Sequence, residues 1–111
     1  MAIAEKEVKL LWGNAAGFCS NPDCRVKLSS IEDENSPFLM GEMAHIVARN
    51  LGGPRADLQG GADVYANLIL LCPNCHTKVD KAPQKFPVET LHSWKSQHED
   101  WVEKSLSGEK F

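Results

Sequence analysis

The sequence predicts a small α+β domain that is held together by a four-cysteine zinc site. Three observations point to this class: the chain has only 111 residues, it carries two cysteine pairs, and its apolar segments have both helical and strand character. A chain of this length buries too little apolar surface to be comfortably stable without a metal or another cross-link. We therefore expect a single domain, residues 1–111, in which helices flank a short β-hairpin.

Three segments have the features of helices. Residues 4–16 and 87–106 each carry an apolar face, with Gly17 as a stop for the first and Pro87 at the start of the second. A shorter helix over residues 75–81 ends before Pro83. The two apolar faces consist of residues at helical spacing, namely Val8, Leu11, Trp12 and Ala15, and then Val88, Leu91, Trp94, Trp101 and Val102.

Strands are expected between the helix over residues 4–16 and the helix over residues 75–81. Residues 38–48 are mostly apolar and lack an internal proline, which favours a strand, and residues 67–71 form its hairpin partner. The glycine-rich loop between them, residues 49–61, is too long for a simple hairpin turn, and such loops are usually functional or mobile. Residues 25–30 are a weaker strand candidate, and residues 32–37 form an acidic turn.

Charge and apolar patterning restrict the partners and the compartment. The formal net charge of −3 argues against binding of nucleic acid by bulk electrostatics, although residues 43–85 carry five Lys or Arg against three Asp. We see no run long enough to span a bilayer and no secretory leader, so we expect a cytoplasmic protein. In that reducing compartment, paired cysteines bind metal more often than they form disulfides.

The cysteines are spaced as two halves of a zinc site. Cys72 and Cys75 are separated by two residues, and Cys19 and Cys24 by four, so four thiolates are available with none left over. A site closed by four thiolates has no open position, and its role is structural. Two disulfides or unpaired core cysteines are the alternatives.

Two motifs carry the residues that point to chemistry. Residues 41–48, GEMAHIVA, contain His45, and residues 67–76, NLILLCPNCH, begin at Asn67 and end at His76. This order of His, Asn and His, bracketed by cysteine pairs, resembles the HNH endonucleases over residues 15–105. The resemblance implies the ββα-metal (His-Me finger) fold, in which a hairpin and a helix close around one divalent cation.

The same resemblance implies a role for each of these residues. His45 matches the general base, Asn67 the asparagine that braces the loop and orients that histidine, and His76 the last metal ligand. Each residue also has a structural alternative: a buried core histidine, a turn or capping asparagine, and a solvated histidine at a helix start.

Residue 44 departs from the family pattern. Many HNH enzymes place a metal ligand just before the general base, but Ala44 cannot bind metal. Glu42 lies one strand repeat earlier, on the same face and with a longer side chain, and a subset of the family has the same Glu-x-Ala-His-Ile pattern. Glu42 is therefore expected either to bind the cation or its water, or to act structurally.

Basic residues around the motifs suit contacts with DNA phosphates. Arg49, Arg55 and Lys78 are the candidates, and their alternative is a solvated surface. His92 and His98 lack metal-ligand neighbours in the sequence, so we expect both to be structural or solvated.

The resemblance implies hydrolysis of DNA to 3′-hydroxyl and 5′-phosphate ends, with Mg²⁺ or Mn²⁺ as catalytic cation and Zn²⁺ at the cysteines. The motif wording is similar to HNH domains of bacterial anti-phage effectors, some of which are fused to a cyclic-nucleotide sensor. The chain could thus be the N-terminal part of a larger effector, a homodimer, or a stand-alone nuclease. A catalytically weak, zinc-bound DNA-binding or interaction module and a purely structural zinc ribbon are the rival functions.

Overall fold

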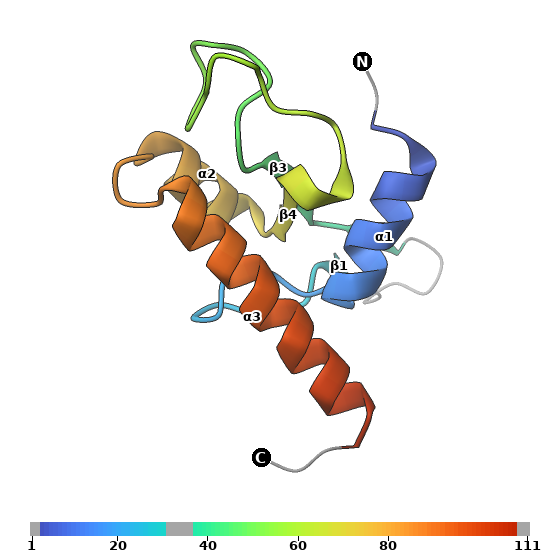
Figure 1. Cartoon of the computed structure of the whole chain (residues 1–111). Coiled ribbons are helices and arrows are strands. Elements are labelled where there is room, and N and C mark those ends of the chain that lie inside the picture. Colours follow the sequence, from blue (N-terminus) through green and yellow to red (C-terminus); the bar gives the residue numbers. More distant parts are fainter. Residues whose placement is uncertain (1–2, 31–36, 109–111) are drawn as a thin grey trace.

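The computed structural model of the chain describes residues 3–30 and 37–108. A central antiparallel hairpin is surrounded by helices, and a long loop rises above it (Figure 1). The fold is therefore the small α+β arrangement that the sequence predicts. Its elements in chain order are α1 (Glu5–Ala15), β1 (Ser29–Ser30), β2 (Phe38–Leu39), β3 (Glu42–His45), the 3₁₀ helix η1 (Tyr65–Asn67), β4 (Leu68–Leu71), α2 (Pro73–Lys81) and α3 (Val88–Leu106).

Strand β4 forms the centre of the core. All four of its side chains are completely buried, because α1 and α2 both pack against it while β3 pairs with it. A strand that is covered on both faces has a continuous apolar sequence, as Leu-Ile-Leu-Leu does here. In the register of the hairpin, His45 lies opposite Leu68, so the two motifs meet at the end of the hairpin that opens into the long loop.

The prediction of one strand over residues 38–48 is wrong. The segment divides at Gly41: β2 pairs with β1, whereas β3 pairs with β4. A Cβ atom at Gly41 would lie 2.6 Å from the indole ring of Trp12, so the chain passes too close to α1 at this point for a larger residue. Beyond His45 the backbone turns into the loop, and the amide of Ile46 donates to the carbonyl of Asn67.

Three other element boundaries differ from the predictions. The strand expected over residues 25–30 is reduced to β1: Arg25 has a left-handed backbone conformation with φ of 51°, and Lys27 forms only an isolated bridge with Phe18. Asn67 belongs to η1 rather than to β4, and α2 begins at Pro73 rather than at residue 75. Of the acidic turn expected over residues 32–37, all but Pro37 lies outside the described residues.

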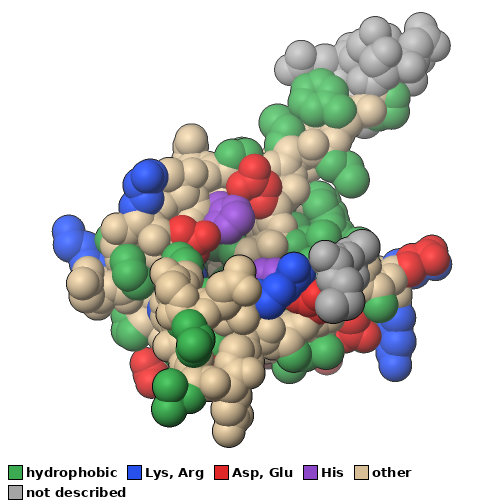
Figure 2. Space-filling view, turned by 90° about the horizontal axis from the view of Figure 1, so that it is seen from above, with side chains coloured by type: hydrophobic (Ala, Val, Ile, Leu, Met, Phe, Trp, Pro, Cys, Tyr) green, Lys and Arg blue, Asp and Glu red, His purple; other side chains and the backbone are tan. Residues whose placement is uncertain are grey.

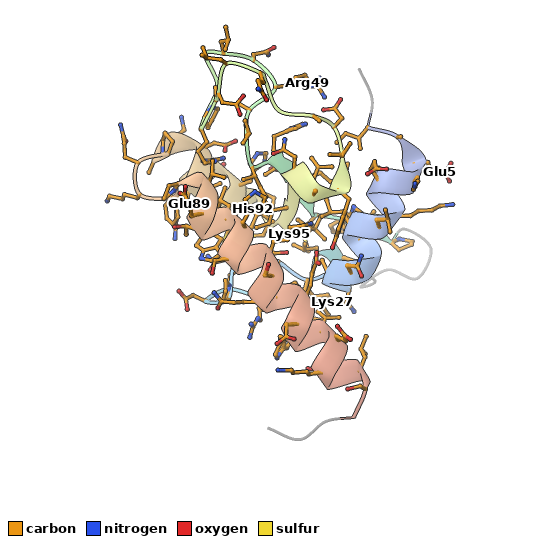
Figure 3. The ribbon with its side chains drawn as sticks, viewed as in Figure 1. Glu5, Lys27, Arg49, Glu89, His92 and Lys95 are labelled. Atoms are coloured by element: carbon orange, nitrogen blue, oxygen red, sulfur yellow. The ribbon has the colours of Figure 1, made fainter. Side chains whose placement is uncertain are left out.

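The helices at the two ends of the chain match the predictions. Helix α3 uses Pro87 as its N-cap and turns Lys95 inward, where the ammonium donates to the carbonyl of Leu68 at 2.9 Å and lies 3.6 Å from the Tyr65 ring centre (Figure 3). Burial lowers the pKa of Lys95, and Glu99 at 3.3 Å partly offsets this effect. These contacts join α3 to the start of β4. Of the helices in residues 3–30 and 37–108, none has the length and apolar character needed to cross a membrane.

Candidate functional site

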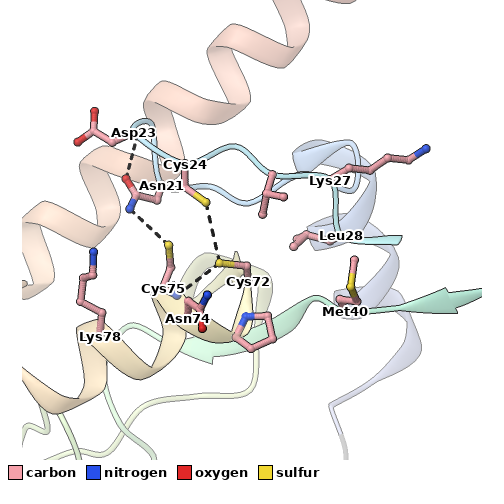
Figure 4. A pocket seen from close by; sticks show the side chains of 12 residues that line it. Asn21, Asp23, Cys24, Lys27, Leu28, Met40, Cys72, Asn74, Cys75 and Lys78 are labelled. Atoms are coloured by element: carbon pink, nitrogen blue, oxygen red, sulfur yellow. Dashed lines mark hydrogen bonds between the residues drawn. The ribbon is translucent and has the colours of Figure 1, made fainter. Parts of the chain in front are cut away.

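The four cysteines come together although they are far apart in the sequence. Their sulfur atoms all lie within 4.8 Å of one another, and Cys24 Sγ is 3.9 Å from Cys72 Sγ (Figure 4). A disulfide requires about 2.05 Å between sulfurs, whereas a tetrahedral zinc ion with bonds of about 2.3 Å holds them roughly 3.8 Å apart. The cysteines are free in this structure, so the disulfide alternative is wrong, and the cluster can hold a metal such as zinc.

Burial and local hydrogen bonds shift the pKa values of three of the four cysteine thiols. Burial raises the pKa of Cys19 and of Cys75. Burial acts in the same direction on Cys72, but hydrogen bonds from the Cys75 amide and from neighbouring thiols outweigh it and lower the Cys72 pKa overall. Four thiolates at this separation would repel one another, and a bound divalent cation removes that cost because the thiolate is the metal-binding form.

A second group of ligand-type side chains lies on the other side of α2, at a shallow hollow of about 420 Å³. His76 is at its centre: Nδ1 is 2.7 Å from Glu42 Oε1, and Nε2 is 2.9 Å from Asp80 Oδ2. A neutral imidazole can donate to only one carboxylate. Glu42 and Asp80 therefore lie beside opposite nitrogens of one ring, where each could share a cation with His76. Among the described residues, only the four cysteines bring three or more ligand atoms together as a metal site.

The structure brings Glu42 to His76, and it adds a residue that the sequence analysis missed. Ala44 is 1% exposed and lies in the core, so it contributes no ligand, while Glu42 projects from the same strand to His76. Asp80 is the missed residue. It follows His76 by four residues on α2, a spacing that places two side chains on one helix face, so the sequence did contain the signal.

His45 lies in a separate network at the end of β3. Its Nε2 is 2.7 Å from Asp63 Oδ1, and both side chains are about one-fifth exposed. Arg49 donates Nη2 to both oxygens of Asp63 at 2.8 Å. Hydrogen bonds from His45 and Arg49 hold the pKa of Asp63 below its usual value. His45 is therefore not a plain core histidine. Asp63 lies eighteen residues away across the loop, and no motif in the sequence indicated that it would contact His45.

The side chain of Asn67 joins the two limbs of the loop. Its Oδ1 accepts from the amide of Val47 at 2.9 Å, and its Nδ2 donates to the carbonyls of Val47 and Ala62 at 3.0 Å each. The limbs approach so closely that a Cβ at Gly61 would lie 1.8 Å from the Val47 carbonyl oxygen. Val47 follows His45 and Ala62 precedes Asp63, so the Asn67 amide fixes the backbone on both sides of the His45–Asp63 contact.

Arg55 connects His45 to the carboxylate cluster. Its Nη2 donates to Asp80 Oδ1 at 2.8 Å and to the His45 carbonyl at 3.4 Å, and its Nε and Nη1 donate to the carbonyls of Ile46 and Val79 at 2.8 Å. Its side chain is only 3% exposed. The expectation that Arg55 binds DNA phosphate is therefore contradicted, because its guanidinium lies inside the protein with its donors occupied.

We predict that Arg55→Met lowers the free energy of unfolding by about 3 kcal/mol. Removing one partner of a buried ion pair costs about 3–5 kcal/mol, and Asp80 is partly exposed, which favours the lower end. Urea unfolding of the zinc-loaded protein measures the change. Lys85→Met, at an exposed position in the next loop, is the control and should change stability by less than about 0.5 kcal/mol. Equal stability of both variants would contradict this role for Arg55.

Of the other residues singled out in the sequence, one belongs to the His45 network and the others lie elsewhere. Arg49 is part of it through Asp63 and lies in the long loop (Figure 3). Lys78 is exposed but lines a hollow of about 530 Å³ beside the cysteine cluster, so it is not grouped with His45 (Figure 4). His92 is exposed, and His98 is buried with its Nε2 2.9 Å from the Ala15 carbonyl oxygen, as expected for solvated and structural histidines.

On the face of the molecule that is seen from above, histidine side chains lie beside acidic side chains (Figure 2). A general-base candidate and a carboxylate–histidine cluster are therefore assembled on one hairpin and one helix, and the cysteine cluster joins the start of that helix to residues 19–24.

Comparison with known proteins agrees with this geometry. A family model described as HNH endonuclease matches residues 35–81, the segment that includes β2, β3, the long loop, β4 and α2. No curated protein matches the chain. The matched segment contains His45, Asn67 and His76, together with Asp63 and Asp80.

Proposed function

We propose, with the HNH endonuclease match of residues 35–81 as the premise, that this protein is a metal-dependent DNA endonuclease. The observation that carries the proposal is the cluster of Glu42, His76 and Asp80, which Arg55 joins to His45. Phosphodiester hydrolysis requires a base that works near neutral pH and positive charge at the phosphate. His45 can supply the base. The neighbouring carboxylates can recruit a cation, which brings the positive charge.

We assign the two metals by the chemistry of their donors. Two carboxylates and one imidazole form an open, oxygen-rich set that suits Mg²⁺ or Mn²⁺, whereas four thiolates suit Zn²⁺. When bound, the Mg²⁺ or Mn²⁺ ion supplies positive charge at the phosphate and at the leaving 3′ oxygen. The zinc ion fixes the start of α2, since Cys72 is the N-cap of that helix and Cys75 lies in its first turn.

The protein residues then perform the following steps. His45 takes a proton from the attacking water, whose oxygen bonds to phosphorus as the bond to the 3′ oxygen breaks. The 3′ oxygen leaves as a hydroxyl after gaining a proton from solvent water, and the phosphate stays on the 5′ end. Asn67 holds the loop that carries these groups, and His76 binds the cation.

Contacts with the DNA backbone are assigned to Arg49 and Lys78. Arg49 is 41% exposed at the edge of the His45 network, where its guanidinium also binds Asp63, and its positive charge would lie close to a bound phosphate. Lys78 is exposed one turn into α2 and would contact a more distant phosphate. Positioning contacts of this kind carry no sequence information.

The cation site is tested by Mn²⁺ binding to zinc-loaded protein, followed by electron paramagnetic resonance. We expect Glu42→Gln and Asp80→Asn each to weaken Mn²⁺ affinity by at least about tenfold, because each removes an anionic ligand. Glu89→Gln, at an exposed position on α3, is the control and should bind as the wild type does. Wild-type affinity in both test variants would remove the cluster from the proposal.

The reaction is tested by the products it leaves. Supercoiled plasmid incubated with the protein and Mg²⁺ should become nicked, and the nicks should be closed by DNA ligase, which requires a 3′-hydroxyl beside a 5′-phosphate. Nicks that ligase closes only after end repair would contradict the proposed bond cleavage.

We further propose a role in phage defence, within or beside a regulatory sensor domain or as a homodimer. Its support is the similarity of residues 44–48 and 71–80 to the HNH domains of bacterial anti-phage effectors. Bacteria that express the protein should give fewer plaques than bacteria that express His45→Ala. Equal plaque numbers over a panel of phages would count against this role.

A further inference from the structure

The carboxylate of Asp63 has no part in the function proposed so far, yet it makes the shortest contact of His45. Oδ1 lies 2.7 Å from His45 Nε2, and neither side chain is more than 23% exposed. Arg49 donates Nε at 3.1 Å and Nη2 at 2.8 Å to this same Oδ1, and its Nη2 also reaches Oδ2 at 2.8 Å. Asp63 is therefore held between a cation and the imidazole.

The hydrogen-bond chemistry of this contact determines where the imidazole proton lies. An ionised carboxylate only accepts hydrogen bonds, so the nitrogen that faces it carries a hydrogen. Hydrogen bonds from His45 and Arg49 lower the pKa of Asp63 and keep it ionised at neutral pH. A neutral His45 ring with hydrogen on Nε2 then has its lone pair on Nδ1, and Nδ1 is the only nitrogen that can accept a proton from water.

The backbone around Asp63 is as tightly fixed as that around His45. Asn67 donates to the carbonyl of Ala62, next to Asp63, and pairs with both backbone groups of Val47. The amide of Gly61 also donates to the Ala48 carbonyl at 2.9 Å. These hydrogen bonds hold the backbone next to Asp63 close to the backbone that follows His45.

We infer that Asp63 is a positioning residue, which holds the His45 ring in the Nε2–H form and directs Nδ1 toward the attacking water. This inference rests on the proposed nuclease function. Asp63 acts through His45 and touches neither DNA nor the cation. The charged groups around the His45 ring and backbone are Asp63, Arg49 and the guanidinium of Arg55.

The first test is the position of the ring proton, which does not depend on activity. Long-range ¹H–¹⁵N correlation spectra of the full, zinc-loaded chain at neutral pH should show His45 with its hydrogen on Nε2. In Asp63→Asn the amide can both donate and accept, so the two ring forms should mix. Asp57→Asn is the matched control. Asp57 caps the amides of Gln59 and Gly60 in the same loop, and its replacement should leave the His45 signals unchanged.

The second test is kinetic. Asp63→Asn should lower kcat for plasmid nicking by roughly 10- to 100-fold with little change in KM, by analogy with the loss of a partner that orients a metal-binding histidine. A wild-type ring with hydrogen on Nδ1, or full activity in Asp63→Asn, would overturn the inference while leaving the nuclease function intact. Absence of nicking by the wild type would overturn the function instead, and the spectra would still decide whether Asp63 fixes the ring.

Discussion

Cys75→Ser is expected to prevent the domain from folding at ordinary temperatures. Cys75 is 5% exposed within a four-sulfur cluster, and serine does not replace a thiolate as a zinc ligand. Structural zinc contributes about 10–16 kcal/mol of apparent binding free energy at neutral pH in small domains, whereas the net stability of a whole domain is about 5–15 kcal/mol. Circular dichroism should show loss of helix, and elemental analysis should fall from one zinc per chain toward none.

A variant with a different zinc ligand separates metal binding from the packing of sulfur. Cys24 is exposed, so a histidine at this position has room and can complete a three-cysteine, one-histidine site. We expect Cys24→His to keep zinc and fold, and Cys24→Ser to lose both. A Cys75→Ser protein that folds cooperatively without metal would show that the cysteines only fill space.

His45→Ala is expected to lower the single-turnover rate of duplex DNA cleavage by roughly 10²- to 10⁴-fold, the usual contribution of a general base. Zinc content and Mn²⁺ affinity should remain at wild-type values, because His45 belongs to neither the cysteine cluster nor the set formed by Glu42, His76 and Asp80. This combination distinguishes loss of the base from loss of the fold or of the cation.

A second histidine provides the control for that experiment. His92 is exposed on α3 and makes no contact with the two networks in the described part of the chain, so His92→Ala should cleave at the wild-type rate. If His45→Ala also cleaved at the wild-type rate, a group other than His45 would have to accept the proton of the attacking water, and the proposed role of His45 would be contradicted.

The parts of the fold that could be predicted were those fixed by local pattern. The periodicity of residues 87–106 depends only on neighbouring residues, and it gave α3 to within one residue. The cysteine spacing predicted the metal cluster because zinc geometry permits few arrangements of four thiolates. His76 and Glu42 do lie in contact, one at a helix start and the other on the adjacent strand, while their role in binding a cation stays a prediction.

The parts that could not be predicted depend on contacts between distant segments. The strand over residues 38–48 divides because Gly41 passes against Trp12, a contact that hydrophobic periodicity does not encode. Arg55 looked like a surface arginine in a glycine-rich loop, but its side chain turns inward to the backbone carbonyls of Ile46, Val79 and Phe86, which belong to three segments. Asp63 meets His45 only because Asn67 draws the two limbs of the loop together.

The central claim is that this site hydrolyses DNA with His45 as base and a divalent cation bound nearby. Its most direct test is the rate at which zinc-loaded wild type and His45→Ala convert supercoiled plasmid to nicked plasmid, each with Mg²⁺ or Mn²⁺ and again with EDTA added just before DNA. The account predicts nicking by the wild type that EDTA abolishes and that His45→Ala lacks. DNA binding by both proteins without nicking by either would contradict it and identify a zinc-bound DNA-binding module instead.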